Sequence, residues 1–166
     1  LRVQIQQANK IQTRHYAIDA NQQTTHSNTE MASAAAEQCL DRAYLDRQGV
    51  GMLAVASTQG DLPAPGMASM VQANLGWPAI EILTTHGICS SSMMALKAAY
   101  NSLRVGDHEA AMVVSSELSS RLLKKQRYEA ATDSTFAANI NVRLGMIIID
   151  GSVCVSSTNR KRDIRN

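Results

Sequence analysis

Apolar runs of strand length alternate with helix-forming segments along the middle of the chain, and this alternation limits the possible folds more than any other feature. The strand-like runs cover residues 52–57, 79–83 and 110–116, and the helical segments between them cover 67–75 and 90–105. Continuous apolar runs are typical of strands that are buried on both faces. Strands separated by helices pair in parallel through right-handed crossovers. We therefore predict an α/β fold with a mostly parallel or mixed sheet and helices on both faces.

A further helix is predicted before the first strand. Ser27-Asn-Thr-Glu30 has the spacing of a capping box, so we expect a helix to begin there and to run to about Arg47. This helix has an apolar stripe that gives Cys39 a place in the core. The stripe consists of Met31, Ala35, Cys39 and Ala43, with Leu40 beside them. The helix over 90–105 has its large apolar residues along one side, namely Met93, Leu96, Tyr100 and Leu103.

Composition restricts the class of protein and its compartment. The chain has 166 residues, enough for one compact domain, and 45% of them are hydrophobic. A net charge of +2 does not by itself indicate a nucleic-acid partner. The three cysteines are far apart and form no CxxC pair, so we expect neither a disulfide framework nor a metal site. Without a membrane-spanning run or a signal peptide, a cytoplasmic location is expected.

Cys89 is the first candidate for chemistry. It follows Glu81-Ile-Leu-Thr-Thr-His-Gly-Ile and precedes Ser90-Ser-Ser-Met-Met, where a strand ends and a helix begins. A thiol at a helix start lies close to unpaired backbone N–H groups and to the positive end of the helix dipole, which favour the nucleophilic thiolate. The alternative is a small buried hydrophobic residue, which accounts for most lone cysteines. Position alone leaves both interpretations open.

The motifs around Cys89 carry a resemblance to a known family. They occur in a fixed order and together span roughly Gln12 to Val155. The motifs are Thr13-Arg14-His15-Tyr16-Ala17, Ala54-Val-Ala-Ser-Thr58, Pro65 to Gln72 followed by Leu75-Gly76, Cys89 with a helix ending at Arg104-Val-Gly-Asp107, Ala111-Met-Val-Val-Ser-Ser-Glu117, and Ile149-Asp150-Gly151-Ser152. In this order the chain resembles the amino-terminal half of the β-ketoacyl-ACP synthase III family, within the thiolase superfamily.

The resemblance implies a fold and a reaction. The fold would be the amino-terminal βαβαβ half of a thiolase-like protein, occupying residues 1–166. Members form a carbon–carbon bond by decarboxylative Claisen condensation, in fatty acid or polyketide biosynthesis. Cys89 would accept an acyl group from acyl-CoA or acyl-ACP, and its own N–H would contribute to an oxyanion hole. The carbanion would come from a malonyl thioester on acyl carrier protein. The resemblance implies no cofactor and no membrane or nucleic-acid partner.

The chain also departs from the family. The histidine and asparagine that support decarboxylation come from the carboxy-terminal half, and none of His15, His26, His86 and His108 matches that histidine. These gaps suggest a fragment or a discontinuous sequence. His86, three residues before Cys89, is a candidate base, although a hydrogen-bonded polar residue at a strand end is the better interpretation. At Asp150-Gly151 a structural turn is favoured over a catalytic carboxylate.

The resemblance assigns further residues to the substrate. Arg14 is a candidate for pairing with a ligand phosphate, and an ordinary surface salt bridge is an equal alternative. Leu62, Met67 and Met70 would shape the acyl pocket of a partner across a homodimer or heterodimer axis. Two function classes follow: a condensing enzyme that uses Cys89, or a non-catalytic thiolase-fold subunit that stabilises or completes a catalytic partner. A different α/β fold with a chance cysteine is a third possibility.

Overall fold

The computed structural model describes residues 15–121, residue 124 and the backbone of a strand at 151–158. The chain divides into two compact units, one from residues 1–25 and 118–151, the other from residues 26–117 and 152–166. In the first unit, Ile18 and Thr24 form an antiparallel bridge. The turn between them is closed by the Asp19 carboxylate, which accepts hydrogen bonds from the backbone N–H groups of Asn21 and Gln23. The second unit contains the sheet and its helices.

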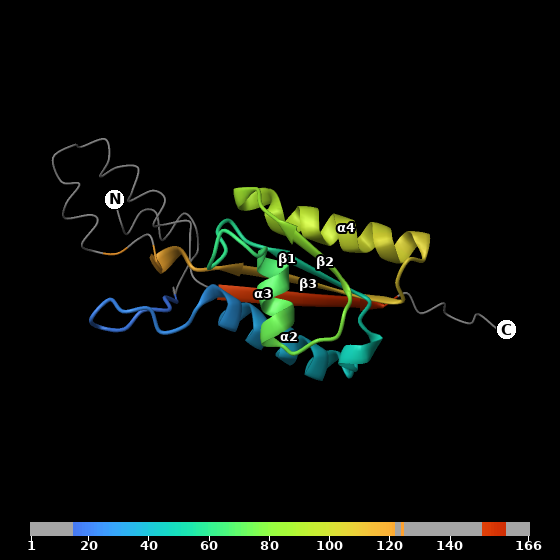
Figure 1. Ribbon diagram of the computed structural model, residues 1–166, viewed down its shortest axis with the longest axis horizontal. Helices are drawn as coiled ribbons and strands as arrows, with labels where there is room; N and C mark the ends of the chain where they lie inside the picture. Colours follow the sequence, from blue (N-terminus) through green and yellow to red (C-terminus); the bar gives the residue numbers. More distant parts are fainter. Residues whose placement is uncertain (1–14, 122–123, 125–150, 159–166) are drawn as a thin grey trace, which may run out of the picture. The chain divides into compact units, whose positions relative to one another are not determined.

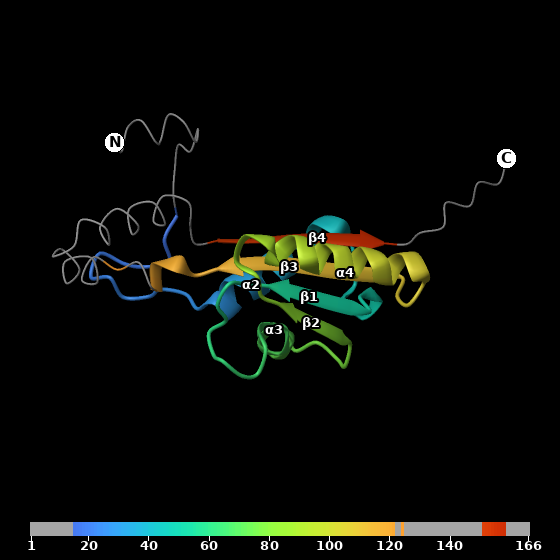
Figure 2. The same ribbon diagram turned by 90° about the horizontal axis from the view of Figure 1, so that it is seen from above.

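The sheet has four strands in the order β2-β1-β3-β4. They are β1 (Met52–Ala56), β2 (Glu81–Thr85), β3 (Ala110–Glu117) and β4 (Gly151–Thr158). The central strand β1 pairs in parallel with both β2 and β3. Figure 2 draws β4 beside β3 and running in the opposite direction, so the sheet is mixed. The alternation of apolar runs and helices therefore predicted the parallel part of the sheet.

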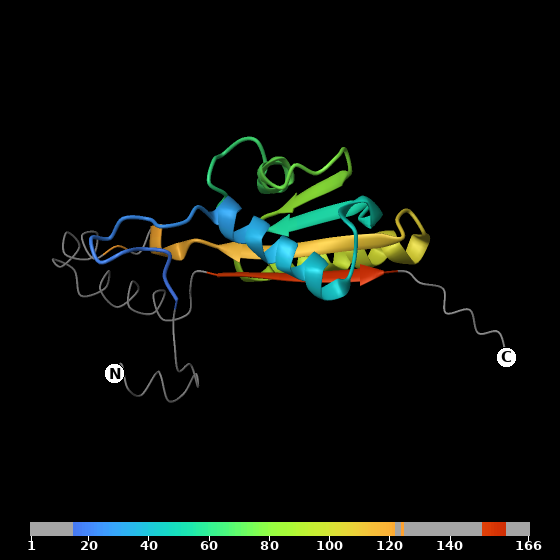
Figure 3. The same ribbon diagram turned by 90° about the horizontal axis from the view of Figure 1, so that it is seen from below.

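Helices cover both faces of this sheet. Figures 1 and 3 show α2 (Asn28–Ala43) and α3 (Met67–Asn74) on one face and α4 (Ser91–Val105) on the other. All five residues of β1 are buried, and successive side chains point to opposite faces. Leu53 and Val55 join the apolar cluster under α2 and α3, whereas Ala54 and Ala56 join the cluster under α4. This two-sided burial explains why β1 has no polar alternation.

The α2 helix begins where its capping box predicts. The Ser27 hydroxyl accepts the Glu30 N–H at 3.1 Å, and the Glu30 carboxylate accepts the Ser27 N–H at 2.8 Å. The helix ends at Ala43, earlier than expected, because Tyr44 adopts a left-handed conformation with φ 51°. The expected stripe is also out of phase: the buried residues are Asn28, Ala32, Ser33, Ala36 and Leu40. Cys39 is only partly buried and packs against the edge of the core.

The α4 helix faces the sheet with small residues. Its buried residues are Ser91, Ala95, Ala99, Ser102 and Leu103. Of the large apolar residues expected along one side, only Leu103 is buried, and Met93, Leu96 and Tyr100 are exposed by 63%, 40% and 57%. Small side chains let the helix axis approach the sheet closely, so the larger ones face outward. As expected, the helix ends at Gly106, whose φ of 85° suits glycine.

The β2 strand lies two residues later than the sequence predicts. We expected 79–83, and the strand covers Glu81–Thr85. Its start is set by pairing: the Glu81 N–H donates to the Gly51 carbonyl at 3.1 Å, and Met52 then lies opposite Glu81. At the other end, Thr84 and Thr85 extend the strand, since β-branched residues favour extended backbone.

None of the helices in the described residues combines the length and the apolar composition that a membrane span requires.

Candidate active site

Cys89 lies at the turn between β2 and α4, as the sequence predicts. The strand ends at Thr85, a single 3-10 turn covers Ile88–Ser90, and α4 begins at Ser91. Cys89 is a free, exposed thiol in the middle of that turn. Ile88, immediately before it, has φ 52°. A β-branched residue in the left-handed region costs roughly 1–2 kcal/mol, so the surrounding contacts must hold this backbone in place.

Three side-chain hydroxyls supply those contacts. Ser90 Oγ donates to the Gly87 carbonyl and Ser91 Oγ donates to the Ile88 carbonyl, each at 2.8 Å. Thr85 Oγ1 donates to the Ser91 carbonyl at 2.9 Å in a buried hydrogen bond. Serine and threonine side chains commonly stabilise turns in this way. Sequence reasoning missed this role of the serines that follow Cys89, although their position beside a turn was the available signal.

His86 ties the same turn to the end of β1. Its Nδ1 lies 3.0 Å from the Ser57 carbonyl oxygen. Because a carbonyl only accepts, Nδ1 carries the proton in this pair. Ser57 is fully buried, and its own N–H donates to the Thr85 carbonyl at 3.2 Å. His86 is thus a hydrogen-bonded polar residue at a strand end, the favoured of the two interpretations of this residue.

Ser57 also belongs to a buried polar network at the carboxyl ends of β1 and β3. Asn28, at the start of α2, is fully buried, and its Nδ2 donates to Ser57 Oγ at 2.9 Å and to the Gln59 carbonyl at 3.1 Å. Its Oδ1 accepts the Ser116 hydroxyl at 2.6 Å. The network joins three segments that are far apart in the sequence. No sequence signal identified it, because each member is an ordinary polar residue.

The loop after β1 is fixed by two carboxylates. Asp61 accepts hydrogen bonds from the N–H groups of Asn28 and Thr29, at 3.0 and 2.7 Å, and from Thr29 Oγ1 at 2.6 Å. Glu117 Oε1, at the end of β3, accepts hydrogen bonds from the Thr58 N–H and from Thr58 Oγ1, at 2.7 and 2.8 Å. Both carboxylates therefore hold the segment that leads to α3.

The predicted pocket residues lie in different environments. Leu62, in the loop after β1, is 57% exposed. Met70 is partly buried against the core, and Met67 is only 1% exposed within it. Met67 therefore packs inside this chain, with no surface available to a partner in the chain alone. Arg14 and Asp150 lie outside the described residues.

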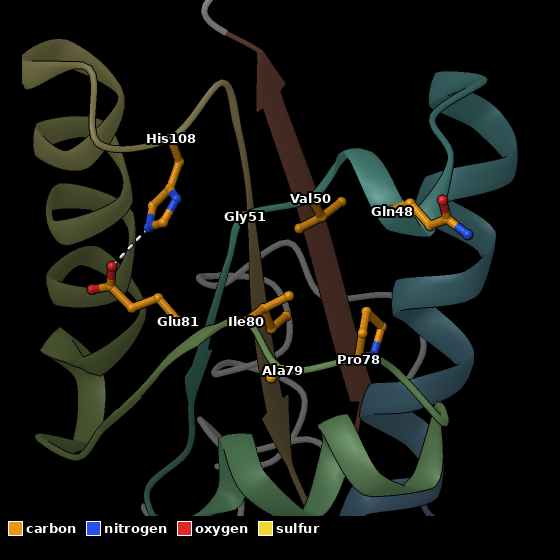
Figure 4. Close-up of a pocket in the computed structure, with 8 residues that line it drawn as sticks. All are labelled: Gln48, Val50, Gly51, Pro78, Ala79, Ile80, Glu81 and His108. Atoms are coloured by element: carbon orange, nitrogen blue, oxygen red, sulfur yellow. Dashed lines mark hydrogen bonds and ion pairs between the residues drawn. The ribbon is translucent and has the colours of Figure 1, made fainter.

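A hollow of about 770 Å³ lies at the opposite edge of the sheet from Cys89. Figure 4 shows the residues that line it, among them Glu81 and His108, joined by a 2.7 Å contact between Oε2 and Nε2. Gly51 makes room for this histidine, since a Cβ there would lie 2.5 Å from its Nδ1. These residues lie at or just before the amino-terminal ends of β1, β2 and β3, whereas sites in parallel sheets lie at the carboxyl ends of strands. We assign the Glu81–His108 pair a structural role.

The exposed Cys89 thiol is the candidate nucleophile of this site. Within the described part of the chain, its backbone N–H has no hydrogen-bond partner, so it is available to a developing oxyanion. Of the four histidines, only His86 lies in the same turn, and its Nδ1 is bound to Ser57. In the described residues, no three His, Cys, Asp or Glu side chains form a cluster suited to a metal ion.

The family profile described as "Thiolase, N-terminal domain" matches residues 8–160, nearly the whole chain. The chain belongs to the thiolase family. As an amino-terminal thiolase domain, it is 33% identical over 116 residues to the β-ketoacyl-[acyl-carrier-protein] synthase III of Ehrlichia canis (strain Jake), covering 70% of this chain and 35% of the relative. It is 34% identical over 113 residues to the protein of the same name from Cereibacter sphaeroides (strain ATCC 17029 / ATH 2.4.9), covering 68% and 33%.

Solved structures share the fold of this thiolase domain. The 3-oxoacyl-[acyl-carrier-protein] synthase III of Aquifex aeolicus VF5 superposes with a TM-score of 0.72 at 21% identity, over 93% of this chain and 43% of that one. The cerulenin-bound OleA of Xanthomonas campestris gives a TM-score of 0.76 at 20% identity, over 92% and 45%. The thiolase domain described here spans about a third of the length of the curated relatives named above.

Proposed function

We propose that this thiolase domain supplies the acyl-accepting cysteine of a condensing enzyme of the β-ketoacyl-ACP synthase III type. The observation that carries the proposal is the exposed Cys89 thiol, held in a hydrogen-bonded turn at the start of α4. The names of the relatives support this reaction class. The substrates would be acyl-CoA or acyl-ACP and a malonyl thioester on acyl carrier protein.

The reaction would proceed in two steps. The Cys89 thiolate attacks the carbonyl carbon of the acyl thioester, and the oxyanion that forms is stabilised by the Cys89 N–H. The bond from carbon to the CoA or ACP sulfur then breaks, and that thiolate leaves and is protonated. In the second step the malonyl thioester loses carbon dioxide, its carbanion attacks the acyl carbon, and the bond to Cys89 Sγ breaks. The thiolate is regenerated and no oxidant is needed.

The second step requires residues beyond those described. His108 lies at the opposite edge of the sheet from Cys89, so it is not placed to support decarboxylation. The outer face of α4 exposes Met93, Leu96 and Tyr100. Contiguous exposed apolar surface is typical of an interaction site. This face supports the proposal that a second thiolase-fold half, carrying the missing histidine and asparagine, packs against α4.

The decisive experiment is acylation of the full chain by acetyl-CoA, followed by intact-protein mass spectrometry. We expect an adduct of one acetyl group on the wild-type protein and on the Cys39→Ser control, and none on Cys89→Ser. Cys39 is the matched control because it is a second free cysteine that is only partly buried. An adduct that persists in Cys89→Ser, or its absence from the folded wild type, would exclude the proposal.

The same exposed face of α4 also favours a second function, that of a non-catalytic subunit that completes a partner. A folded wild-type chain that forms a complex but takes no acyl group would support it. Dimer formation by a thiolase-fold chain is tested by sedimentation at micromolar concentration.

Leu62, Met70 and Arg14 stay proposed as pocket or ligand residues. A monomer in the sedimentation experiment would count heavily against Leu62 and Met70 shaping a partner's pocket.

A further inference from the structure

The end of the β1–β2 ladder has an unusual hydrogen-bond pattern. Ala56 lies opposite Thr85, so Ser57 would lie opposite His86 if the ladder continued. Ser57 N–H does continue it, donating to the Thr85 carbonyl at 3.2 Å. In a regular parallel ladder the Ser57 carbonyl would then accept the N–H of Gly87. It accepts His86 Nδ1–H instead, at 3.0 Å.

The substitution of a side-chain donor for a backbone donor has a geometric consequence. Ser57 is fully buried, and an unsatisfied buried carbonyl is costly, so its carbonyl needs a donor. Because the His86 ring provides one, Gly87 is released from the sheet and the chain turns away there. Ile88 then adopts its φ of 52°, and the Gly87 and Ile88 carbonyls accept the Ser90 and Ser91 hydroxyls.

We propose that His86 is a positioning residue for Cys89: its Nδ1–H ends the β2 ladder at Thr85 and so fixes the turn that carries the thiol. This proposal rests on the proposed function, because it concerns the geometry of the same nucleophile. His86 acts through the backbone and takes no proton from Cys89.

Three substitutions of His86 test whether the Nδ1 donor is the group that matters. Asn places its amide nitrogen at the position of Nδ1, so His86→Asn retains the donor to Ser57. His86→Ala removes it, and His86→Gln moves it one bond further out. His108→Asn is the matched control, since it removes a histidine at the opposite edge of the sheet.

The first measurement is the rate of Cys89 acetylation by acetyl-CoA in the full chain. Loss of one hydrogen bond that sets reactive geometry is worth about tenfold, so we expect His86→Ala and His86→Gln to react about tenfold more slowly. His86→Asn and His108→Asn should react within about twofold of the wild type. Alkylation of Cys89 by iodoacetamide needs no oxyanion hole and should change by less than about threefold in every variant.

Two outcomes would overturn the inference. Equal acetylation of His86→Ala and wild type would show that the ring positions nothing. A His86→Asn variant as slow as His86→Ala would show that the Nδ1 donor is not what matters, as expected if the ring were a base. Alkylation of Cys39 in the same samples monitors unfolding, because Cys39 is partly buried in α2.

A second measurement does not depend on acylation. Amide hydrogen exchange of a peptide spanning residues 86–92 should be about fivefold faster in His86→Ala and unchanged in His86→Asn. Exchange over α3 should be the same in all variants. Unchanged exchange in His86→Ala would overturn the positioning role even if Cys89 were never acylated. Failure of the proposed function alone would instead leave the exchange difference intact and remove the acetyl adduct from the wild type.

Discussion

Asn28 offers the most informative test of how this fold is held together. Its side chain is fully buried and connects the start of α2 to Ser57, Gln59 and Ser116. Substitution by alanine removes the amide and leaves at least two buried polar partners without it. Since each such loss costs about 1–3 kcal/mol, we expect Asn28→Ala to lower the free energy of unfolding by about 3 kcal/mol.

Asn28→Asp has nearly the same shape and distinguishes hydrogen bonding from packing. The aspartate would place a carboxylate oxygen against the Gln59 carbonyl, which also only accepts. It would also bring a negative charge close to Asp61, which accepts the N–H of residue 28 itself. Burying this charge should cost at least about 2 kcal/mol beyond the alanine variant.

The assay is urea unfolding followed by far-ultraviolet circular dichroism. With a slope of about 2 kcal/mol per molar urea, the alanine variant should unfold about 1.5 M earlier than the wild type. Asn101→Asp, on the exposed surface of α4, is the control and should lie within about 0.5 kcal/mol of the wild type. An Asn28→Asp variant as stable as the wild type would refute the reasoning, because it would show that the amide donor to Ser57 and Gln59 contributes nothing.

Three further predictions concern the helices and the sheet edge. Hydrogen bonds from the Ser27 backbone and side chain hold the pKa of Glu30 below its ordinary value of 4.5. The ionised Glu30 therefore contributes its full stability above pH 4.5, and this contribution is lost as the pH falls through the lowered pKa. The difference in melting temperature between wild type and Glu30→Gln should accordingly shrink between pH 7 and pH 3. Ala99→Leu overfills the space between α4 and the sheet and should cost about 1–3 kcal/mol, or about 2–4 °C of melting temperature per kcal/mol. Glu81→Gln removes the carboxylate from a partly exposed contact with His108 and should change the free energy of unfolding by less than about 1 kcal/mol, with a smaller effect in high salt; a larger loss would show that this contact stabilises the fold more than exposed contacts do.

The sequence predicted the elements of the fold better than their faces. The capping box at Ser27 and the glycine at 106 are local signals, and both ends lie where they indicate. The stripe of large apolar residues on α4 does not mark its buried side. Close packing against a sheet selects Ala95 and Ala99 instead, and hydrophobicity alone does not contain that requirement.

The position of Cys89 could be predicted from the sequence, but the hydrogen bonds that hold its turn could not. Cys89 stands at the junction of a predicted strand and a predicted helix, so its position followed from local pattern. The hydrogen bonds that hold the junction depend on residues about thirty positions apart, as for His86 with Ser57 and Asn28 with Ser57. Such pairings follow from strand register and from how distant segments pack together, which no single segment specifies.

Ser57 contacts Asn28 and His86 with different parts of the residue, so the attachment of α2 and the position of the turn that carries Cys89 depend on separate groups. Asn28 binds its hydroxyl, whereas His86 binds its backbone carbonyl. Any residue at position 57 keeps the second contact, but only one with a suitable polar group keeps the first. Evolution or a protein engineer can therefore change how firmly α2 is attached without altering the turn that carries Cys89. Position 57 offers a way to tune stability independently of reactivity.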